Sequence, residues 1–457
     1  MSLVRRRTRS RAELGRIGIA IAIACALAIV YQRSPALIAL IVPTGMAGML
    51  LFVGLRFVIY RPADTDDETI RWLRHVTSVM FVVHLLIALV INSSGQLVET
   101  FGGDAVTYHL GASEIVNHWN SGSGVGDGFV QTGKEGFFYA LGALYWLFGT
   151  YQTAGLAVNA ALAAAAVPLV YDTTRRLFGH EAARVAAVMV MILPGFLVWT
   201  SQLLREAPVV FFLALAGNAT IRLTERASLG PCAVLAGSIA VLFTLRANVA
   251  LVAAGGLLLG LVVGGTRVLA STTAGMTVVT LIIVLVLALG IGYEGYRLTS
   301  GADLQAISDI RQALAQTANT GLLPETDIST GPKAARFLPL ALVNFALGPF
   351  PWQARNLRQL GGVVDALTLW FLLPSLWRGW ARAGRVVGRR RIALVAPALF
   401  VAVGLSLLLG NSGTVVRERL QVTIFLLPLA AYGWTQRKQP ATEPRPPAAA
   451  AALSRRW

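Results

Sequence analysis

One acidic residue, Asp104, stands where a short helix is expected to begin. From Asp104 to Trp119 the apolar side chains recur at helical spacing, with Tyr108, Ala112, Ile115 and Trp119 on one stripe. A carboxylate held by such a helix could act as a general base, which removes a proton from an attacking hydroxyl group. It could equally be a helix N-cap, because Asp accepts hydrogen bonds from the first-turn amides. The spacing leaves both interpretations open.

A second set of residues could bind an anion at the membrane boundary. Its members are Lys134 and Glu135, Arg205 and Glu206, Arg246, and Arg417 and Arg419. Guanidinium groups match phosphate oxygens with paired donors. The alternative for each arginine is snorkelling, in which the side chain reaches toward lipid headgroups. Lys134 and Glu135 could likewise be a solvated anchor pair. Tyr108 and His109, which follow Asp104, complete the candidate substrate-binding residues.

The composition indicates the elements that must position these residues. The chain of 457 residues is 55% hydrophobic and only 13% charged, whereas soluble domains carry about 25% charged residues. This excludes a soluble enzyme, a disordered protein and a nucleic-acid-binding domain as first interpretations. The sequence therefore predicts an all-α polytopic membrane protein.

Apolar runs of the length of a bilayer-spanning helix predict about twelve transmembrane helices. They lie near 17–31, 36–55, 76–91, 152–171, 182–199, 207–221, 231–245, 249–263, 274–292, 363–377, 392–409 and 420–434. The run from Pro231 to Gly265 is too long for one helix and is divided at Arg246-Ala247-Asn248. Two shorter runs, 137–148 and 337–352, are predicted to be interfacial or re-entrant segments.

The distribution of charge predicts the orientation. With both short runs on the outer side, most of the 39 Lys and Arg residues fall on the side that holds both termini, while the 22 Asp and Glu residues are spread more evenly. Cytoplasmic loops are rich in Lys and Arg. We therefore expect a multi-pass protein of the cell membrane with both termini in the cytoplasm and its active face outside. Arginines on that outer face need a reason other than topology.

Five segments follow from this reading. Residues 1–75 form an N-terminal helical hairpin with a basic cytoplasmic flank, and 76–293 form a membrane core with the outer loop 92–151. Residues 294–362 form a second outer loop with an interfacial segment, 363–434 form the C-terminal membrane helices, and 435–457 form a disordered cytoplasmic tail rich in Pro and Ala.

Two residue types inside the apolar runs favour structural roles. His84 is the main ionisable residue within a predicted span, and a lone histidine there is expected to pair with a neighbouring helix, although such residues can also be functional. Cys25 and Cys232 both lie in apolar runs, so neither a disulfide framework nor a thiolate metal site is expected.

The order of these features resembles the class C membrane glycosyltransferases, and especially the relatives of the protein O-mannosyltransferases and of the aminoarabinose transferases that modify lipid A. The resemblance runs from about residue 76 to 434 and is densest over 133–222. It rests on Gly133-Lys134, Leu141-Gly142-Ala143-Leu144-Tyr145-Trp146-Leu147-Phe148-Gly149, Thr174-Arg175-Arg176-Leu177-Phe178-Gly179 and the Arg205-Glu206 link. The stretches Leu338-Pro339 to Trp352 and Asn411 to Arg417 are similar to polysaccharide-associated members.

The resemblance implies a transferase that moves a sugar from a polyprenyl-phosphate donor to an exported glycan, lipid or protein acceptor on the outer face, with inversion at the anomeric carbon. By the same resemblance Asp104 is the catalytic base, Lys134 lies near the donor phosphate and Glu206 is the second-loop acidic residue. Loop 92–151 contains no Asp-x-Asp pair, so neither a metal nor another cofactor is expected. Membrane lipids are the other expected partners, and nucleic acid is not.

Three alternatives remain from the sequence. A lipid flippase or solute transporter would have a similar number of spans, but transporter sites lie near the midplane on broken helices, and the polar groups here gather at one face. A non-catalytic membrane scaffold could keep the fold without the chemistry. A polymerase or ligase of surface polysaccharide would share the spans and the outer arginines.

Overall fold

The computed structural model describes residues 40–50, 66–101, 103–122, 133–265, 304–317, 321–323, 326–354 and 356–437, with isolated positions at 130 and between 275 and 284. Across these residues the backbone is helical apart from turns, short connections and one isolated bridge between Gly321 and Asn411. The all-α class is therefore confirmed. The predicted span at 17–31, most of the predicted span at 274–292, and the predicted tail beyond residue 437 lie outside the described residues.

The chain forms two compact units, and each is described by itself. The first comprises residues 1–165 and 198–208, and the second comprises residues 166–197 and 209–457. Besides Leu40–Leu50, the first unit contains α3 (Asp67–Asn92), α4 (Gly95–Phe101), α5 (Gly103–Ser121), α6 (Glu135–Phe148) and the beginning of α7 (Gln152–Phe178). The end of α9 (Pro194–Thr200) and the start of α10 (Glu206–Glu225) also belong to it.

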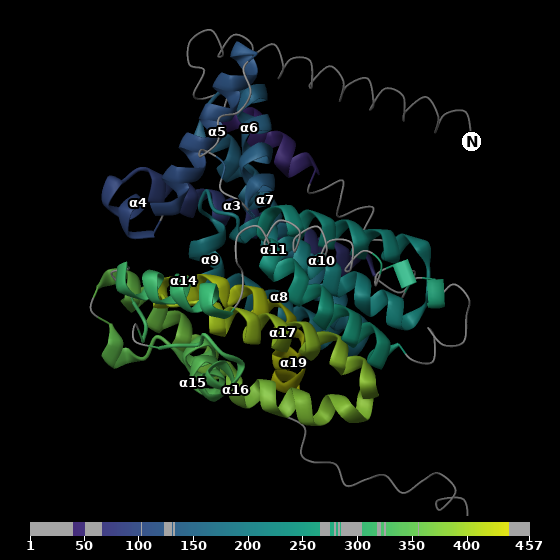
Figure 1. The fold of residues 1–457 in the computed structure, drawn as a ribbon. Helices are drawn as coiled ribbons and strands as arrows, with labels where there is room; N and C mark the ends of the chain where they lie inside the picture. The colour runs from purple at the N-terminus through teal and green to yellow at the C-terminus, as the bar shows by residue number, and fades with distance from the viewer. Residues whose placement is uncertain are drawn as a thin grey trace, which may run out of the picture. The chain divides into compact units, whose positions relative to one another are not determined.

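The second unit contains the remaining parts of α7, α9 and α10 and the C-terminal helices (Figure 1). Its other helices are α8 (His180–Ile192), α11 (Leu229–Gly264), α14 (Leu304–Thr317), α15 (Gly331–Leu347), η1 (Pro351–Gln353), α16 (Leu357–Val386), η2 (Gly388–Arg391), α17 (Ile392–Leu408), α18 (Ser412–Glu418) and α19 (Leu420–Thr435).

Within the described residues, six helices are long and apolar enough to cross a membrane. They are α3, α7, α10, α11, α16 and the continuous stretch from η2 through α17, and the bent pair α8 and α9 would be a seventh. A polytopic membrane protein is thereby confirmed. The total of twelve spans stays a prediction, since shorter apolar helices cover 40–50 and 420–435.

Two apolar stretches of the second unit contain a break. α8 and α9 meet at a 58° bend, where Leu193 is extended and Pro194 follows it, so the span predicted at 182–199 is not one straight helix. In α11 the backbone of Arg246 has φ −162° and ψ 82°, which interrupts the helix at one residue. The break thus falls where the sequence placed a turn at 246–248.

The two interfacial segments are also present as helices. The run 137–148 is α6, a helix of 14 residues. The run 337–352 begins earlier than predicted, because α15 starts at Gly331 and continues to Leu347 before η1. Neither helix meets the length and hydropathy of a span.

Glycines allow a close contact between α16 and α19 in the second unit. A Cβ atom at Gly379 would lie 1.9 Å from the Leu429 carbonyl oxygen, and one at Gly433 would lie 1.8 Å from the Ser375 carbonyl oxygen. Only glycine allows the backbones to approach so closely, which is a common way of packing helices in membranes. This contact fixes α19 against α16, and both helices contribute to the features described below.

Candidate active site

Asp104 is exposed and lies in the first turn of α5. The helix begins at Gly103, one residue earlier than predicted, so Asp104 stands inside the first turn and not at the N-cap position. The N-cap interpretation is therefore wrong in its position. A carboxylate in the first turn is still favoured by the helix dipole, and its exposure leaves it accessible to a substrate hydroxyl group.

The apolar stripe of α5 packs on α6. Tyr108, Ala112 and Ile115, three residues of the predicted stripe, are buried, while Trp119 is 41% exposed and stacks on Tyr139. The ring of Tyr108 lies between those of Phe137 and Phe138, with centroids 4.9 and 5.1 Å away. The contacts of the Tyr108 ring are thus those of a core residue, and its predicted contact with substrate stays a prediction.

His109 is half-buried and joined to α6 by a hydrogen bond. Its Nδ1 lies 2.9 Å from the Tyr145 hydroxyl oxygen. Burial lowers the pKa of His109 below its usual 6.5 and raises the pKa of Tyr145 well above its usual range. At neutral pH both groups are therefore uncharged, and the pair fixes α5 against α6 beside Asp104.

Lys134 and Glu135 begin α6 in the same unit. Lys134 occupies the N-cap position without a side-chain capping bond, and Glu135 lies in the first turn. Both residues are half-buried. The His109–Tyr145 bond joins the start of α5 to the end of α6, whereas Lys134 precedes the start of α6. A shared role of Asp104 and Lys134 therefore stays a prediction.

The link that carries Arg205 and Glu206 is buried, although the sequence predicted a polar outer link. Ser201 is 0% exposed, Glu206 is 1% exposed and Arg205 is 9% exposed. Asn159 of α7 holds this link, because its Nδ2 donates to the carbonyl oxygens of Gln202 at 2.6 Å and Leu204 at 2.7 Å. Arg205 and Glu206 are therefore fixed inside the protein.

His84 supports the same link from α3. It is fully buried, and its Nε2 lies 2.8 Å from the Thr200 hydroxyl oxygen while its Nδ1 lies 2.9 Å from the Met80 carbonyl oxygen. The prediction that His84 pairs with a neighbouring helix is confirmed. Its role in this structure is to connect α3 to the end of α9.

In the second unit, Arg246 forms an ion pair with Glu418. The Nη2 atom lies 2.9 Å from the Glu418 Oε1, and the two side chains are only 3% and 7% exposed. The break in α11 thereby meets the end of α18. Arg417, the preceding residue, is 7% exposed. Burial inside protein argues against snorkelling for both arginines, since a snorkelling head group remains in contact with water.

Arg419 is enclosed more completely. Its Nη2 donates to Asp365 Oδ2 at 2.7 Å, and its Nη1 donates to the carbonyl oxygens of Phe345, Ala346 and Gly348 at the end of α15. Asp365 also accepts from the Gly195 amide at 2.9 Å. Arg419 thus organises α15, α16 and the start of α9, and its buried Nε–H group has no hydrogen-bond partner among the described residues.

Asp365 and Glu418 are two buried acidic residues for which the sequence predicted no role. Asp365 lies two residues inside the predicted span 363–377, and its side chain is 3% exposed. An ionisable residue within an apolar span is a signal in itself. The same reasoning that singled out His84 could have found Asp365.

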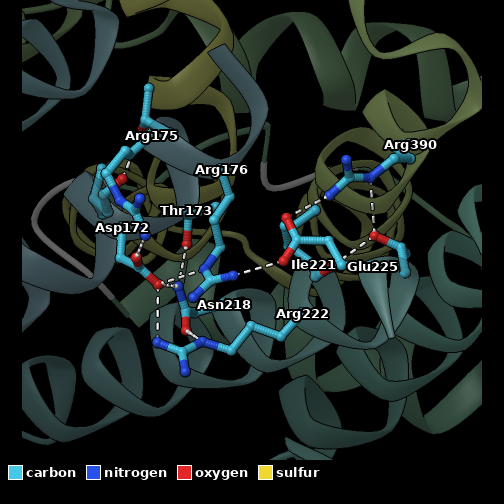
Figure 2. A network of polar contacts seen from close by, with 12 residues as sticks. Asp172, Thr173, Arg175, Arg176, Asn218, Ile221, Arg222, Glu225 and Arg390 are labelled. Carbon is cyan, nitrogen blue, oxygen red and sulfur yellow. Dashed lines mark hydrogen bonds and ion pairs between the residues drawn. The ribbon is translucent and has the colours of Figure 1, made fainter. Parts of the chain in front are cut away.

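A second polar network joins the C-terminal ends of α7 and α10 (Figure 2). Asp172, which is 2% exposed, accepts from Arg175, Arg176 and Arg222 at 2.8–2.9 Å, and Asn218 donates to it at 3.0 Å. Glu225 then bridges Arg176 and Arg390. All of these residues belong to the second unit.

Among the residues that the structure describes, no three His, Cys, Asp or Glu side chains are grouped as a metal ion would require. The expectation that catalysis uses no metal ion stays a prediction from the sequence.

Residues 136–291 match the family of dolichyl-phosphate-mannose-protein mannosyltransferases. This match covers about a third of the chain and supports a membrane glycosyltransferase of the class C type. The matched stretch contains Arg205, Glu206 and Arg246, whereas Asp104 and Lys134 precede it and Arg417 and Arg419 follow it. A comparison with curated proteins gave no match.

Proposed function

We propose that this protein is a glycosyltransferase and that it moves a sugar from a polyprenyl-phosphate donor to an exported acceptor on the outer face of the membrane. The family match supports sugar transfer, and the family's name refers to a dolichyl-phosphate donor. Both termini are in the cytoplasm in this proposal. The acceptor is a glycan, lipid or protein that presents a hydroxyl group.

The observation that carries the proposal is the burial of arginines at ends of the second unit's helices. Arg246, Arg417 and Arg419 are 2%, 7% and 3% exposed. Charges buried in a low-dielectric interior interact with an anion more strongly than they would in water. Phosphate leaving from a sugar gains negative charge in the transition state, and a fixed guanidinium stabilises that charge. Arg246 and Arg419 are already paired with Glu418 and Asp365, so Arg417 is the arginine of this group that the proposal relies on most.

In the proposed reaction, Asp104 accepts the proton of the acceptor hydroxyl group as its oxygen attacks the anomeric carbon. The new carbon–oxygen bond forms as the bond from the anomeric carbon to the phosphate oxygen breaks, and the electron pair of that bond leaves with polyprenyl phosphate. Attack opposite the leaving group inverts the anomeric centre. Lys134, Arg205, Arg246 and Arg417 are the candidate cationic residues for the phosphate in this proposal.

The Asp104→Asn variant tests the role of the base. Asn retains an oxygen that can accept hydrogen bonds but cannot take up a proton as a carboxylate does. We expect transfer to fall by about 10²–10⁴-fold, the usual contribution of a positioned general base, while the melting temperature and the affinity for the donor stay close to those of the wild type.

Glu114→Gln is the matched control, because Glu114 lies on the same helix and also loses its charge in this variant. We expect it to transfer sugar at the wild-type rate. Wild-type transfer by Asp104→Asn, with labelled donor and purified protein, would remove Asp104 from the mechanism.

A further inference from the structure

Two groups of arginines in the second unit differ in their partners. The network of Figure 2 is charge-compensated, since its arginines surround the carboxylates of Asp172 and Glu225. We refer to the other group as the arginine cluster, and its members are Arg378, Arg382, Arg385 and Arg437. None of these four forms an ion pair with a carboxylate of the described residues, because their contacts are with carbonyl and hydroxyl oxygens and aromatic rings.

The arginine cluster gathers where α16 and α19 end. Its three members on α16 stand at positions i, i+4 and i+7, so they share one face of that helix. The Arg382 Nη1 donates to the carbonyl oxygen of Gln436, the C-cap residue of α19, at 2.7 Å. Arg437 is the next residue, and its guanidinium carbon lies 4.1 Å from the Trp434 ring centroid. The four guanidinium groups therefore belong to one end of the helix pair.

The positive charge of the cluster exceeds what the two helices offset. Each helix C-terminus carries about half a negative charge, so α16 and α19 together offset about one of the four positive charges. Arg378 donates to the Ser375 hydroxyl oxygen at 3.1 Å, while its Nε is buried without a hydrogen-bond partner among the described residues. Arg385 and Arg437 are exposed. The cluster thus has both charge and hydrogen-bond donors left for an anion.

The same face of α16 is apolar toward the middle of the helix. Phe371 precedes Arg378 by seven residues on that face and is 60% exposed, and Trp377 beside it is 72% exposed. α16 is long and apolar enough to cross a membrane, so exposed apolar side chains of this kind contact lipid, and tryptophan is enriched at the level of the headgroups. From Phe371 to Arg385 the helix rises about 21 Å at ~1.5 Å per residue. The arginine cluster therefore lies at the level of the headgroups.

An anionic phospholipid has the chemistry that fits this arrangement. Its phosphate oxygens match the paired donors of a guanidinium group, and its acyl chains can lie along the apolar part of α16. A free phosphate ion would leave the exposed Phe371 and Trp377 without a role. The charge count of the sequence predicts the cytoplasmic side for this end of α16, and the cytoplasmic leaflet carries anionic lipids that basic pockets between helices bind.

We propose that the arginine cluster binds the phosphate headgroup of an anionic phospholipid in the cytoplasmic leaflet. Bound lipid offsets the remaining positive charge and holds the end of α16 beside the end of α19. The four arginines lie outside the stretch 136–291 that matches the family, so the family match does not imply this site.

The test measures lipid binding by the purified full chain in a neutral detergent. Phosphatidylglycerol brominated on its acyl chains quenches tryptophan fluorescence when it binds, and brominated phosphatidylcholine is the zwitterionic comparison. Arg378→Gln with Arg382→Gln removes two charges of the cluster. Arg226→Gln with Arg389→Gln is the matched control, because both residues are exposed arginines of the second unit, lie outside the cluster and have the same predicted side.

We expect the wild type to bind phosphatidylglycerol more tightly than phosphatidylcholine. The variant that lacks Arg378 and Arg382 should bind phosphatidylglycerol about tenfold or more weakly, since each basic residue beside an anionic lipid surface contributes about fivefold to binding. The control variant should bind both lipids as the wild type does. Raising the salt concentration should weaken binding of phosphatidylglycerol to the wild type more than to the cluster variant, because salt screens exposed charges.

A second variant keeps the test informative if the first one misfolds. Arg385 and Arg437 are exposed, so Arg385→Gln with Arg437→Gln removes two charges of the cluster and leaves the contacts of Arg378 and Arg382 in place. This variant should also lose about tenfold in affinity for phosphatidylglycerol.

Three results would overturn the proposal. They are wild-type affinity for phosphatidylglycerol in a cluster variant that folds, an equal loss of affinity in the control variant, and equal affinity of the wild type for the two lipids. The assay contains no sugar donor, so its outcome is independent of the proposed function.

Discussion

Replacing Asp365 with Asn tests the buried ion pair that organises the C-terminal helices. The Asp365 carboxylate accepts from Arg419 at 2.7 Å and from the Gly195 amide at 2.9 Å, and the side chains of the pair are each 3% exposed. Asn is almost the same size and can still accept from Gly195. The variant therefore removes the negative charge and little else, which leaves the Arg419 guanidinium buried without its counter-ion.

The expected loss is about 3–5 kcal/mol of the free energy of unfolding, the usual effect of breaking a buried pair by removing one partner. Removal of both charges in Asp365→Leu with Arg419→Met should cost less than Asp365→Asn alone, because apolar residues of similar volume can replace a buried pair with little loss. Denaturant titration of each purified variant in detergent, at constant salt, measures its free energy of unfolding.

A second variant examines the same contact from the other side. A Cβ atom at Gly195 would lie 2.5 Å from Asp365 Oδ1, so Gly195→Ala should also destabilise the protein by displacing the carboxylate. Gly237→Ala, where a Cβ would meet nothing within 4 Å, is its control. The reasoning is refuted if Asp365→Asn unfolds at the same denaturant concentration as the wild type, or if the double variant is the least stable of the set.

Three further predictions concern other parts of the molecule. Arg246→Ala and Arg417→Ala should each weaken binding of the donor by about 1.5–3 kcal/mol, the usual effect of a lost charged hydrogen bond. The Lys variants should recover only part of the lost affinity. Isothermal titration with polyprenyl phosphate measures the affinity, and unchanged affinity in both Ala variants would contradict the prediction. Burial lowers the pKa of His109 below 6.5, so the unfolded chain binds a proton at His109 more tightly than the folded chain does. The folded state therefore keeps its full stability above pH 6.5 and loses part of it as the pH falls toward the lowered pKa. Between pH 7.5 and 5.5 the melting temperature should fall less in His109→Gln than in the wild type, and parallel curves would refute this. In a variant that lacks Cys25 and Cys232, a membrane-impermeant thiol reagent added to intact cells should label Thr330→Cys and miss Val386→Cys, at two exposed positions, and the reverse labelling would overturn the proposed orientation.

The sequence predicted local features better than contacts between distant segments. α5 and α6 were predicted because apolar periodicity and run length are local properties, and the break at Arg246 followed from a run too long for one span. The partner of His84 could be anticipated as a neighbouring helix but not as Thr200, since that contact depends on packing. The burial of the link at 200–206 was missed, because its polar residues look like those of a solvated loop.

The role of Arg419 shows the same limit. Its position next to an apolar span suggested an anion-binding residue, but the bond to Asp365 joins residues 54 positions apart. Only the folded chain shows that two of its nitrogen atoms are already used. The apolar pocket that Arg419 lines also depends on how α15, α16, α17 and α19 pack. Nothing in the apolar pattern of each helix separates a pocket-lining residue from one that faces lipid.

Transfer from a defined donor measures the central claim most directly. Purified protein in detergent is incubated with polyprenyl-phosphate sugars labelled in both the sugar and the lipid, and with an acceptor that presents hydroxyl groups. The account predicts that one polyprenyl phosphate is released for every sugar transferred, that the product has the inverted anomeric configuration, and that Asp104→Asn releases far less of both. Release of a polyprenyl diphosphate from diphosphate-linked sugars instead would favour a polymerase or ligase, and movement of intact donor across a bilayer without cleavage would favour a transporter; either result would contradict the account.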